Sequence, residues 1–398
     1  MHLHHQQKTL HVPRQGADKS SHVWQDPAPL SHPAGLPTLE LSPAFRCSNL
    51  FRILVFGFWF CFLPAPGQVK LSTRELPPLP DELGVAGAFA GVSGDALLVA
   101  GGANFPGRPP WDGGQKKWHD EIYVLPRNAT NWLTGFKLPH PLAYGVSVPY
   151  DGGVLCLGGS DAERHYREVF LLRWRAGRVL IETNFPPLPH PLANACGTIC
   201  VGGVILAGGE AAPGATRALN EAWRLNPAAT DAAWERLPDL PGPGRSLALA
   251  ATYGSSVYIL GGVSLFAGPD DKPTRRYLTD VYLLTSHGLA WQRQKALPYP
   301  RAAAPGPAPQ IGNGWVVLLG GDDGSRYNFQ PAAEHPGFLA GLLLWHPGRA
   351  LFRAGGVLTA ARVTTPAVVW GNEIVIPSGE TRPGVRSPAV TAYRLETP

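Results

Sequence analysis

The stretch Val154-Leu-Cys-Leu-Gly-Gly159 is a short apolar run that ends in a glycine doublet, and it recurs along the chain. A sixth and last copy, at 374–379, has Ser-Gly in place of the doublet. Successive copies stand 50 to 59 residues apart, and self-similarity at such a period indicates a repeat architecture. The other four copies are Leu97–Gly102, Val204–Gly209, Val257–Gly262 and Val316–Gly321.

Further apolar segments flank each copy and complete a four-stranded unit. A tight turn before the run, as at 92–95 or 370–372, is typical of a hairpin. Third strands are expected at 122–125, 169–172, 222–225, 281–284 and 342–345, and Trp132, Trp234 and Trp291 mark fourth strands. Four strands per repeat of this length resemble the kelch-type β-propeller. We therefore predict an all-β fold of six blades over residues 68–398, in preference to a β-sandwich with accidental doublets.

The phase of the repeat predicts how the ring closes. The last repeat ends at Tyr393–Glu396 after only three strands, while Val69–Glu75 resembles a fourth strand without a blade. We expect this amino-terminal strand to complete the sixth blade, which removes an exposed sheet edge.

Composition excludes several classes of protein. The 398 residues include 47 Gly, 42 Pro and 44% hydrophobic residues, which is too apolar for a disordered chain. The glycines also lack the strict period of collagen. The net charge of +5 is a mild excess without clustered Lys and Arg, so no nucleic-acid partner is expected.

The first 67 residues differ from the repeats. Residues 1–45 are polar and rich in His, Pro and Ser, and we interpret them as a disordered leader or a misplaced start. Residues 46–67 carry two arginines, an eleven-residue apolar run and a small-residue end, which is typical of a secretory signal. A permanent anchor is the alternative, although eleven residues are few for a bilayer. We expect a periplasmic or secreted protein with no membrane contact beyond this segment.

The cysteines do not indicate a disulfide framework or a metal site. Of the five, only Cys156, Cys196 and Cys200 lie in the repeats. Cys156 stands in an apolar run and is expected to be a buried small hydrophobe. Cys196 and Cys200 lack the second pair that a zinc site requires, so no metal is predicted.

Loops that leave second strands and loops that lead into first strands open on the same face of a propeller. Their residues are therefore expected to converge at the channel mouth. Arginines there suit an anionic ligand, and a carboxylate among them can act as a general acid or base. The residues after the doublets are Asn104, Arg108, Asp161, Arg164, Glu210, Arg217, Asp322, Asp323, Arg326, Glu380, Arg382 and Arg386. Arg245, Arg301 and Arg362 precede first strands, where bridging between neighbouring blades is the alternative role.

Four segments carry a resemblance to a known family. Gly84–Gly91, Ala100–Gly107, Ala143–Pro149 and Ser378–Arg386 resemble the N-acetylneuraminate epimerases, or sialic acid mutarotases. The Gly-Glu-x-x-Pro-Gly-x-Arg motif closes this chain, so the order resembles the cyclically permuted branch of the family. The resemblance implies interconversion of the anomers of a small acidic sugar without a cofactor. We expect a monomer or a homodimer.

The resemblance also implies roles for particular residues. Glu380 would accept a proton and Arg386 would hold the sugar carboxylate, while Glu210, Asp322 and Asp323 are candidates for the acid. Leu142 and Ser160 stand where the family pattern has Arg and Glu, so this chain lacks one binding arginine and one carboxylate. The remaining candidates for substrate binding are Asn104, Arg217, Arg245, Arg301, Arg326, Arg362 and Arg382. Trp111, Lys117, Trp118 and His119 form a cluster that could stack on a sugar or pack at a strand.

Two other functions fit the same repeats. A copper enzyme resembling galactose oxidase needs paired Tyr and His ligands, whereas the histidines here are scattered one per region. A non-catalytic propeller that binds a glycan or a protein is the stronger alternative, because the fold alone supports it equally. The adjacent Glu380 and Arg386 favour the enzyme, since a pure binder has no use for a base beside the arginine.

Overall fold

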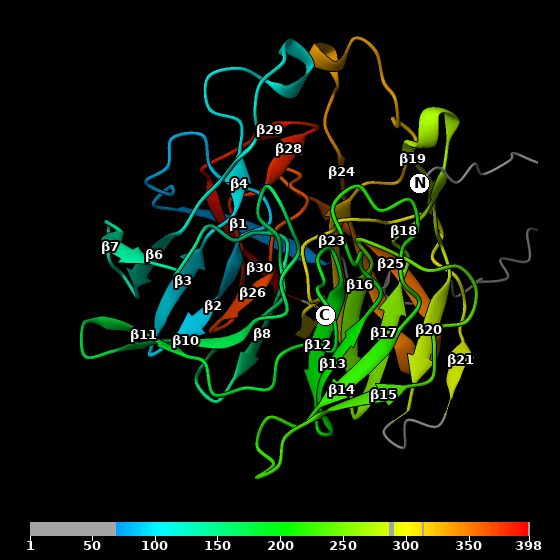
Figure 1. The fold of residues 1–398 in the computed structure, drawn as a ribbon, viewed down its shortest axis with the longest axis horizontal. Helices are drawn as coiled ribbons and strands as arrows, with labels where there is room; N and C mark the ends of the chain where they lie inside the picture. The colour runs from blue at the N-terminus through cyan, green and yellow to red at the C-terminus, as the bar shows by residue number, and fades with distance from the viewer. Residues whose placement is uncertain (1–68, 286–289, 313, 397–398) are drawn as a thin grey trace, which may run out of the picture. The chain divides into compact units, whose positions relative to one another are not determined.

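The structure is a computed structural model that describes residues 69–396, except 286–289 and 313 (Figure 1). The expected leader at 1–45 and signal at 46–67 lie outside the described residues. Within the described part, no helix is long and apolar enough to cross a membrane.

Six four-stranded antiparallel sheets form the blades of a β-propeller, which confirms the predicted fold class. Blade 1 consists of β2 (Phe89–Ser93), β3 (Ala96–Ala100), β6 (Glu121–Pro126) and β7 (Leu133–Lys137). Blade 2 consists of β8 (Val146–Tyr150), β9 (Gly153–Leu157), β10 (Val169–Arg175) and β11 (Arg178–Glu182). Blade 3 consists of β12 (Cys196–Cys200), β13 (Gly203–Ala207), β14 (Ala222–Leu225) and β15 (Trp234–Leu237). Blade 4 consists of β16 (Leu249–Tyr253), β17 (Ser256–Leu260), β20 (Val281–Leu284) and β21 (Trp291–Arg293). Blade 5 consists of β22 (Gln310–Ile311), β23 (Trp315–Gly321), β24 (Leu339–His346) and β25 (Leu351–Val357). Blade 6 consists of β26 (Val368–Trp370), β27 (Glu373–Pro377), β30 (Val390–Glu396) and β1 (Lys70–Leu76).

The amino-terminal strand closes the ring, as the phase of the repeat predicts. β1 pairs antiparallel with β30 over its whole length, from Lys70 opposite Glu396 to Leu76 opposite Val390. The strand order β1-β30-β27-β26 makes β1 the outer strand of blade 6. Both ends of the described chain therefore lie in one blade.

The glycine doublets of blades 1 to 4 join each blade to the next, through Gly102, Gly159, Gly209 and Gly262. The doublet glycines have positive φ, for example +65° at Gly101 and +96° at Gly102, which favours glycine. The Gly102 N–H donates to the carbonyl of Leu142, which leads into blade 2. A Cβ on Gly101 would collide with that same carbonyl oxygen, so the doublet allows the close approach of backbones.

The apolar core is divided among the six interfaces between blades, each filled by one cluster of buried side chains. In three blades a tryptophan side chain adds a hydrogen bond to the backbone: the Trp132 indole N–H donates to the Pro77 carbonyl at 2.9 Å. Trp234 and Trp291 make the same bond to Pro186 and Pro238. One buried leucine repeats before every blade: Leu79, Leu138, Leu188, Leu240, Leu297 and Leu358.

A ring of six backbone hydrogen bonds links the blades at the central channel. One residue from each blade donates its N–H to the carbonyl of its counterpart in the preceding blade, at 2.7–2.9 Å, and blade 1 donates back to blade 6. All six have positive φ, although five of them are not glycine. We call these residues the channel ring: Gly87, Tyr144, Asn194, Leu247, Ala303 and Thr364.

Three extra hairpins extend from the blades beyond their second strands. They are β4 (Ala103–Asn104) with β5 (Lys117–Trp118), β18 (Val263–Ala267) with β19 (Pro273–Tyr277), and β28 (Glu380–Arg382) with β29 (Val385–Arg386). Figure 1 shows all three on the upper side, together with the loops that carry the short 3-10 helices η1 (Pro110–Asp112), η2 (Pro269–Asp271) and η3 (Ala332–Glu334). A fourth 3-10 helix, η4 (Pro347–Arg349), joins β24 to β25. The sequence did not predict these hairpins.

Candidate active site

A cavity of about 690 Å3 opens among these hairpins and loops. Five members of the channel ring, all but Gly87, form part of its lining. The complete ring also lines a second, smaller cavity of about 100 Å3 in the channel. The channel ring thus separates the large cavity from the rest of the channel, and its residues form the cavity floor.

Glu380 and Arg386 face each other across the β28–β29 hairpin at one side of the cavity. The register pairs the two residues, and the tight turn at Pro383-Gly384 places the Gly384 N–H 2.7 Å from Glu380 Oε1. Arg386 Nη1 lies 3.2 Å from the same oxygen, and Arg386 Nε donates to the Ala103 carbonyl. Among the described residues, Glu380 Oε2 and Arg386 Nη2 have no hydrogen-bond partner. One carboxylate oxygen and one guanidinium nitrogen therefore remain available to a ligand.

Glu380 holds one of six equivalent positions around the channel. The first residue after each doublet forms an isolated bridge with the segment that leads into the same blade. Alanine, serine and valine occupy three of these positions, and carboxylates occupy the other three. In blade order the six are Ala103, Ser160, Glu210, Val263, Asp322 and Glu380.

Glu210 lies three blades away from Glu380, on the opposite side of the six-fold ring. Its Oε1 accepts hydrogen bonds from Ser246 Oγ at 2.5 Å and from Asn194 Nδ2 at 3.2 Å. Its Oε2 has no hydrogen-bond partner among the described residues. Glu210 and Glu380 are therefore two carboxylates that each have one oxygen free at the cavity wall.

The two aspartates of the wall are more fully engaged. Asp322 Oδ2 accepts from the Tyr277 hydroxyl at 2.6 Å and Oδ1 accepts from the Gly324 N–H. Burial and the bond to Asp322 raise the pKa of Tyr277 above its usual range. Burial raises the pKa of Asp161, but hydrogen bonds from Tyr166 and two backbone N–H groups outweigh it and leave that pKa below its ordinary value.

His165 contributes a hydrogen-bond acceptor. Its Nδ1 lies 3.0 Å from the carbonyl oxygen of Glu210, so Nδ1 carries the proton and donates. Nε2 then keeps a lone pair at the cavity wall. Burial lowers the pKa of His165, which favours the neutral imidazole near pH 7.

Three of the predicted binding arginines lie elsewhere. Arg245, Arg301 and Arg362 are at most 2% exposed and are not part of the cavity wall. Arg245 forms an ion pair with Asp280 at 2.7 Å. Arg301 donates to the Leu318 carbonyl and the Tyr299 hydroxyl, and Arg362 to Ala389 and Thr391. The expectation that they line the channel mouth is wrong, because the side chains turn back into their own blades.

The same correction applies to the missing arginine at Leu142. Leu142 and Leu192 hold, in blades 2 and 3, the position that Arg245 holds in blade 4, since each carbonyl accepts from the preceding doublet. Leu142 is buried in the core between blades 1 and 2. At this position a side chain packs within the propeller, so Leu142 does not remove a ligand contact from the cavity.

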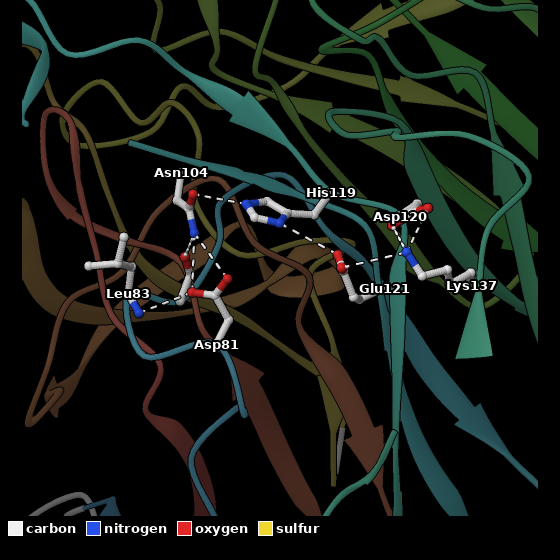
Figure 2. A network of polar contacts seen from close by, with 8 residues as sticks. Asp81, Leu83, Asn104, His119, Asp120, Glu121 and Lys137 are labelled. Atoms are coloured by element: carbon white, nitrogen blue, oxygen red, sulfur yellow. Dashed lines mark hydrogen bonds and ion pairs between the residues drawn. The ribbon is translucent and has the colours of Figure 1, made fainter. Parts of the chain in front are cut away.

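Asn104 is buried in a polar network outside the cavity wall (Figure 2). Its Nδ2 donates to Asp81 at 3.1 Å and to the Gly84 carbonyl at 2.9 Å. Its Oδ1 lies 2.9 Å from His119 Nε2, and Figure 2 shows the network continuing through Glu121. With all its polar atoms engaged, Asn104 fixes the start of the 105–116 loop, and the expectation that it lies at the channel mouth is wrong.

Of the other predicted site residues, some line the cavity and some do not. Glu210, Arg326, Glu380, Arg386, Asp161 and Asp322 line the cavity, whereas Arg108, Arg164, Arg217, Asp323 and Arg382 do not. Arg382 donates to the Ala333 carbonyl at 2.6 Å, outside the wall. In the segment 105–119, Trp118 lines the cavity but Trp111, Lys117 and His119 do not.

Sequence reasoning missed Lys116, Phe105, Tyr144, His165 and Tyr277, which all line the cavity. Period-two alternation could have found Lys116, since it directly precedes β5 and stands two residues from Trp118, whereas Lys117 is exposed. No sequence pattern marked the others. Within the described part of the chain, no group of three or more His, Cys, Asp or Glu is placed to hold a metal ion.

Comparison with known proteins supports the resemblance over part of the chain. Residues 70–181 match the family model for N-acetylneuraminate epimerase. The N-acetylneuraminate epimerase of Brucella suis is 43% identical over 125 residues, which cover 28% of this chain and 31% of that protein. The enzymes so named in Yersinia pestis and Salmonella enteritidis are 34% and 40% identical, over 36% of this chain in both cases. The matched stretches span about a third of the length of these relatives.

A solved structure titled "Structure of YjhT" has a similar fold. It aligns with a TM-score of 0.57 over 81% of this chain and 99% of that chain. The sequence identity is 17%, so this likeness supports the fold alone. The resemblance to N-acetylneuraminate epimerases is thus confirmed for residues 70–181, and the cyclic permutation stays a prediction.

Proposed function

From the epimerase resemblance and the cavity geometry together, we propose that this protein interconverts the anomers of N-acetylneuraminate or a related acidic sugar. The observation that carries the proposal is the Glu380–Arg386 pair. It presents an available carboxylate oxygen beside an available guanidinium nitrogen in a cavity large enough for a sugar. The names of the curated relatives favour the same small sugar as substrate.

Anomer exchange at the hemiketal carbon needs one base and one acid. Glu380 Oε2 takes the proton of the anomeric hydroxyl while an acid protonates the ring oxygen, and the bond between that oxygen and the anomeric carbon breaks. The open form has a ketone and a free hydroxyl. Rotation about the adjacent carbon–carbon bond presents the other ketone face, the hydroxyl adds back, and both protons return. Positioning and one acid/base pair suffice for this chemistry.

Glu210 is the acid candidate that the geometry supports best. Both oxygens of Asp322 already accept hydrogen bonds, and Asp323 lies outside the cavity wall. Glu210 has Oε2 free and lies across the channel from Glu380, so a sugar ring between them meets one carboxylate on each side. Asn194 and Ser246 fix the orientation of Glu210.

Proton NMR of freshly released α-N-acetylneuraminate tests the proposal. Catalytic amounts of protein should accelerate the approach to the equilibrium mixture of anomers. Glu380→Gln keeps the shape but removes the base, so the rate should fall by about 100-fold or more. Arg382→Gln is a matched control on the same hairpin, outside the cavity wall, and should keep the rate. A wild-type rate equal to that of buffer, with ligand resonances broadened, would indicate a non-catalytic sugar-binding propeller.

A further inference from the structure

The Glu380–Arg386 pair carries no net charge, so it does not by itself explain attraction of an anion. Arg386 uses Nε for the Ala103 carbonyl and Nη1 for Glu380. Of the three guanidinium nitrogens, Nη2 is the one that makes no hydrogen bond to the described residues, so the contact with a substrate carboxylate is assigned to it. A second cation without a carboxylate partner would supply the missing charge.

Lys116 is such a cation on the adjacent wall. The β4–β5 register pairs Ala103 with Trp118 and Asn104 with Lys117, and Phe105 and Lys116 are the next residues of the loop that joins these two strands. The Nζ of Lys116 lies 5.7, 5.3 and 5.1 Å from the ring centroids of Phe105, Trp118 and Tyr144. Among the described residues, no carboxylate lies within ion-pair distance of it. Three rings orient the ammonium without neutralising it.

Lys116 and Arg386 meet at the same ring. The Arg386 guanidinium carbon lies 4.7 Å from the Phe105 centroid. The 105–116 loop also packs on the β28–β29 turn, because a Cβ on Gly384 would collide with Pro110. The turn that positions Glu380 and the loop that carries Lys116 are thus in direct contact. The position of one cation is linked to that of the other.

This corner also holds polar groups without partners. The Trp118 indole Nε1 and the Tyr144 hydroxyl are buried and have no hydrogen-bond partner among the described residues. Buried donors without acceptors are rare in folded proteins, and a ligand that brings acceptor oxygens is one explanation. Both side chains line the cavity and both touch Lys116.

We propose that Lys116 is the residue that selects an anionic sugar, binding the substrate carboxylate together with Nη2 of Arg386 at the corner formed by Phe105, Trp118 and Tyr144. The proposal rests on the proposed function for the identity of the sugar. It assigns charge selection to Lys116 and leaves proton transfer to Glu380. A neutral sugar of the same shape would lose the contact with the ammonium.

The test measures binding of a ligand that cannot turn over. The methyl α-glycoside of N-acetylneuraminate cannot open its ring, and its methyl ester also lacks the charge. Titration calorimetry would compare the wild type with Lys116→Met, which keeps the aliphatic stem, and with Lys117→Met, the exposed neighbour outside the wall. We expect the Kd of the acid glycoside to rise about 10- to 100-fold in Lys116→Met and to stay unchanged in Lys117→Met. The ester should bind weakly and equally to all three proteins.

Three results would overturn the proposal. They are an unchanged Kd in Lys116→Met, an equal loss for acid and ester, which indicates packing alone, and no binding of the acid glycoside by a folded wild type. The two proposals fail separately. Binding that depends on Lys116 without faster anomer exchange rejects the enzymatic function only, whereas exchange that is indifferent to Lys116→Met rejects the present inference only.

Discussion

Arginines predicted to bind the ligand lie in different environments, which include the cavity wall and the buried interior of the blades. Arg386 lies at the cavity wall and keeps a nitrogen for a ligand. Arg245, Arg301 and Arg362 are buried, and burial lowers the pKa of the last two guanidiniums. A buried cation is stable only where carbonyls, hydroxyls or a carboxylate compensate for the lost water, and each of the three has such partners.

This distinction predicts the effect of Arg245→Ala. Removal of the side chain leaves Asp280 without its partner in a nearly closed site, and we expect a loss of about 3–5 kcal/mol of stability. Arg245→Leu should cost less, because Leu142 and Leu192 hold the same position in other blades. Thermal unfolding measures both variants. A normal melting temperature with weakened sugar binding would instead restore Arg245 to the ligand site.

The sequence placed the acid and base candidates better than the binding residues. Glu210 directly follows a glycine doublet and Glu380 follows the Ser-Gly that replaces it in blade 6, so their position after the second strand fixes their place beside the channel. Asn104 and Arg382 stand one or two residues farther on, where the direction of the side chain depends on hairpin pairing. That pairing is short and outside the repeat. Charge and spacing alone therefore assigned them to the cavity in error.

At the scale of elements, the second strand of each blade was predictable because it is a buried apolar run that recurs every 50 to 59 residues, and the other blade strands were placed relative to it. The hairpins β4–β5, β18–β19 and β28–β29 were not, since their strands have only two to five residues, show no regular alternation of buried and exposed side chains, and among the described residues occur in three blades. These irregular elements form much of the cavity wall. The part of the molecule with the least periodic sequence thus carries most of the candidate chemistry.

Removal of strand β1 should lower the stability of the propeller. Without it, β30 becomes an exposed edge, and the cluster between blades 5 and 6 loses the contacts of Val69 and Leu71. The ion pair of Arg74 with Glu373 is lost as well. For a chain that begins at Pro77 we expect a lower melting temperature and self-association, measured by thermal melts and light scattering.

A peptide of residues 69–76 added in trans separates two explanations. If the open edge causes the loss, the peptide should pair with β30 and raise the melting temperature again. A peptide with Thr73→Pro, which lacks the N–H of that residue, serves as the control. An unchanged melting temperature in the truncated chain would show that β1 does not stabilise blade 6.

At the scale of the molecule, the ring is closed in blade 6, where strands from the two ends of the described chain pair. A turn between two strands of another blade offers an equivalent place for the chain ends. Lys70 lies opposite Glu396, so a short linker can join them. A cut between Ala176 and Gly177, in the exposed β10–β11 turn, makes β11 the closing strand of blade 2. We expect this permutant of residues 69–396 to fold with the near-ultraviolet circular dichroism and melting temperature of the parent. Aggregation or a loss of tertiary signal would show that blade 6 is a privileged place of closure.

The channel ring has a consequence for how a ligand is received. An open series of hydrogen bonds frays at its two ends, where the terminal bonds break first. The six bonds of the channel ring form a closed series, so none of them is terminal. Five members of that ring lie under the ligand cavity. The cavity floor is therefore preorganised, so little binding energy goes into ordering it, and adaptation to different ligands is left to the hairpins and loops above.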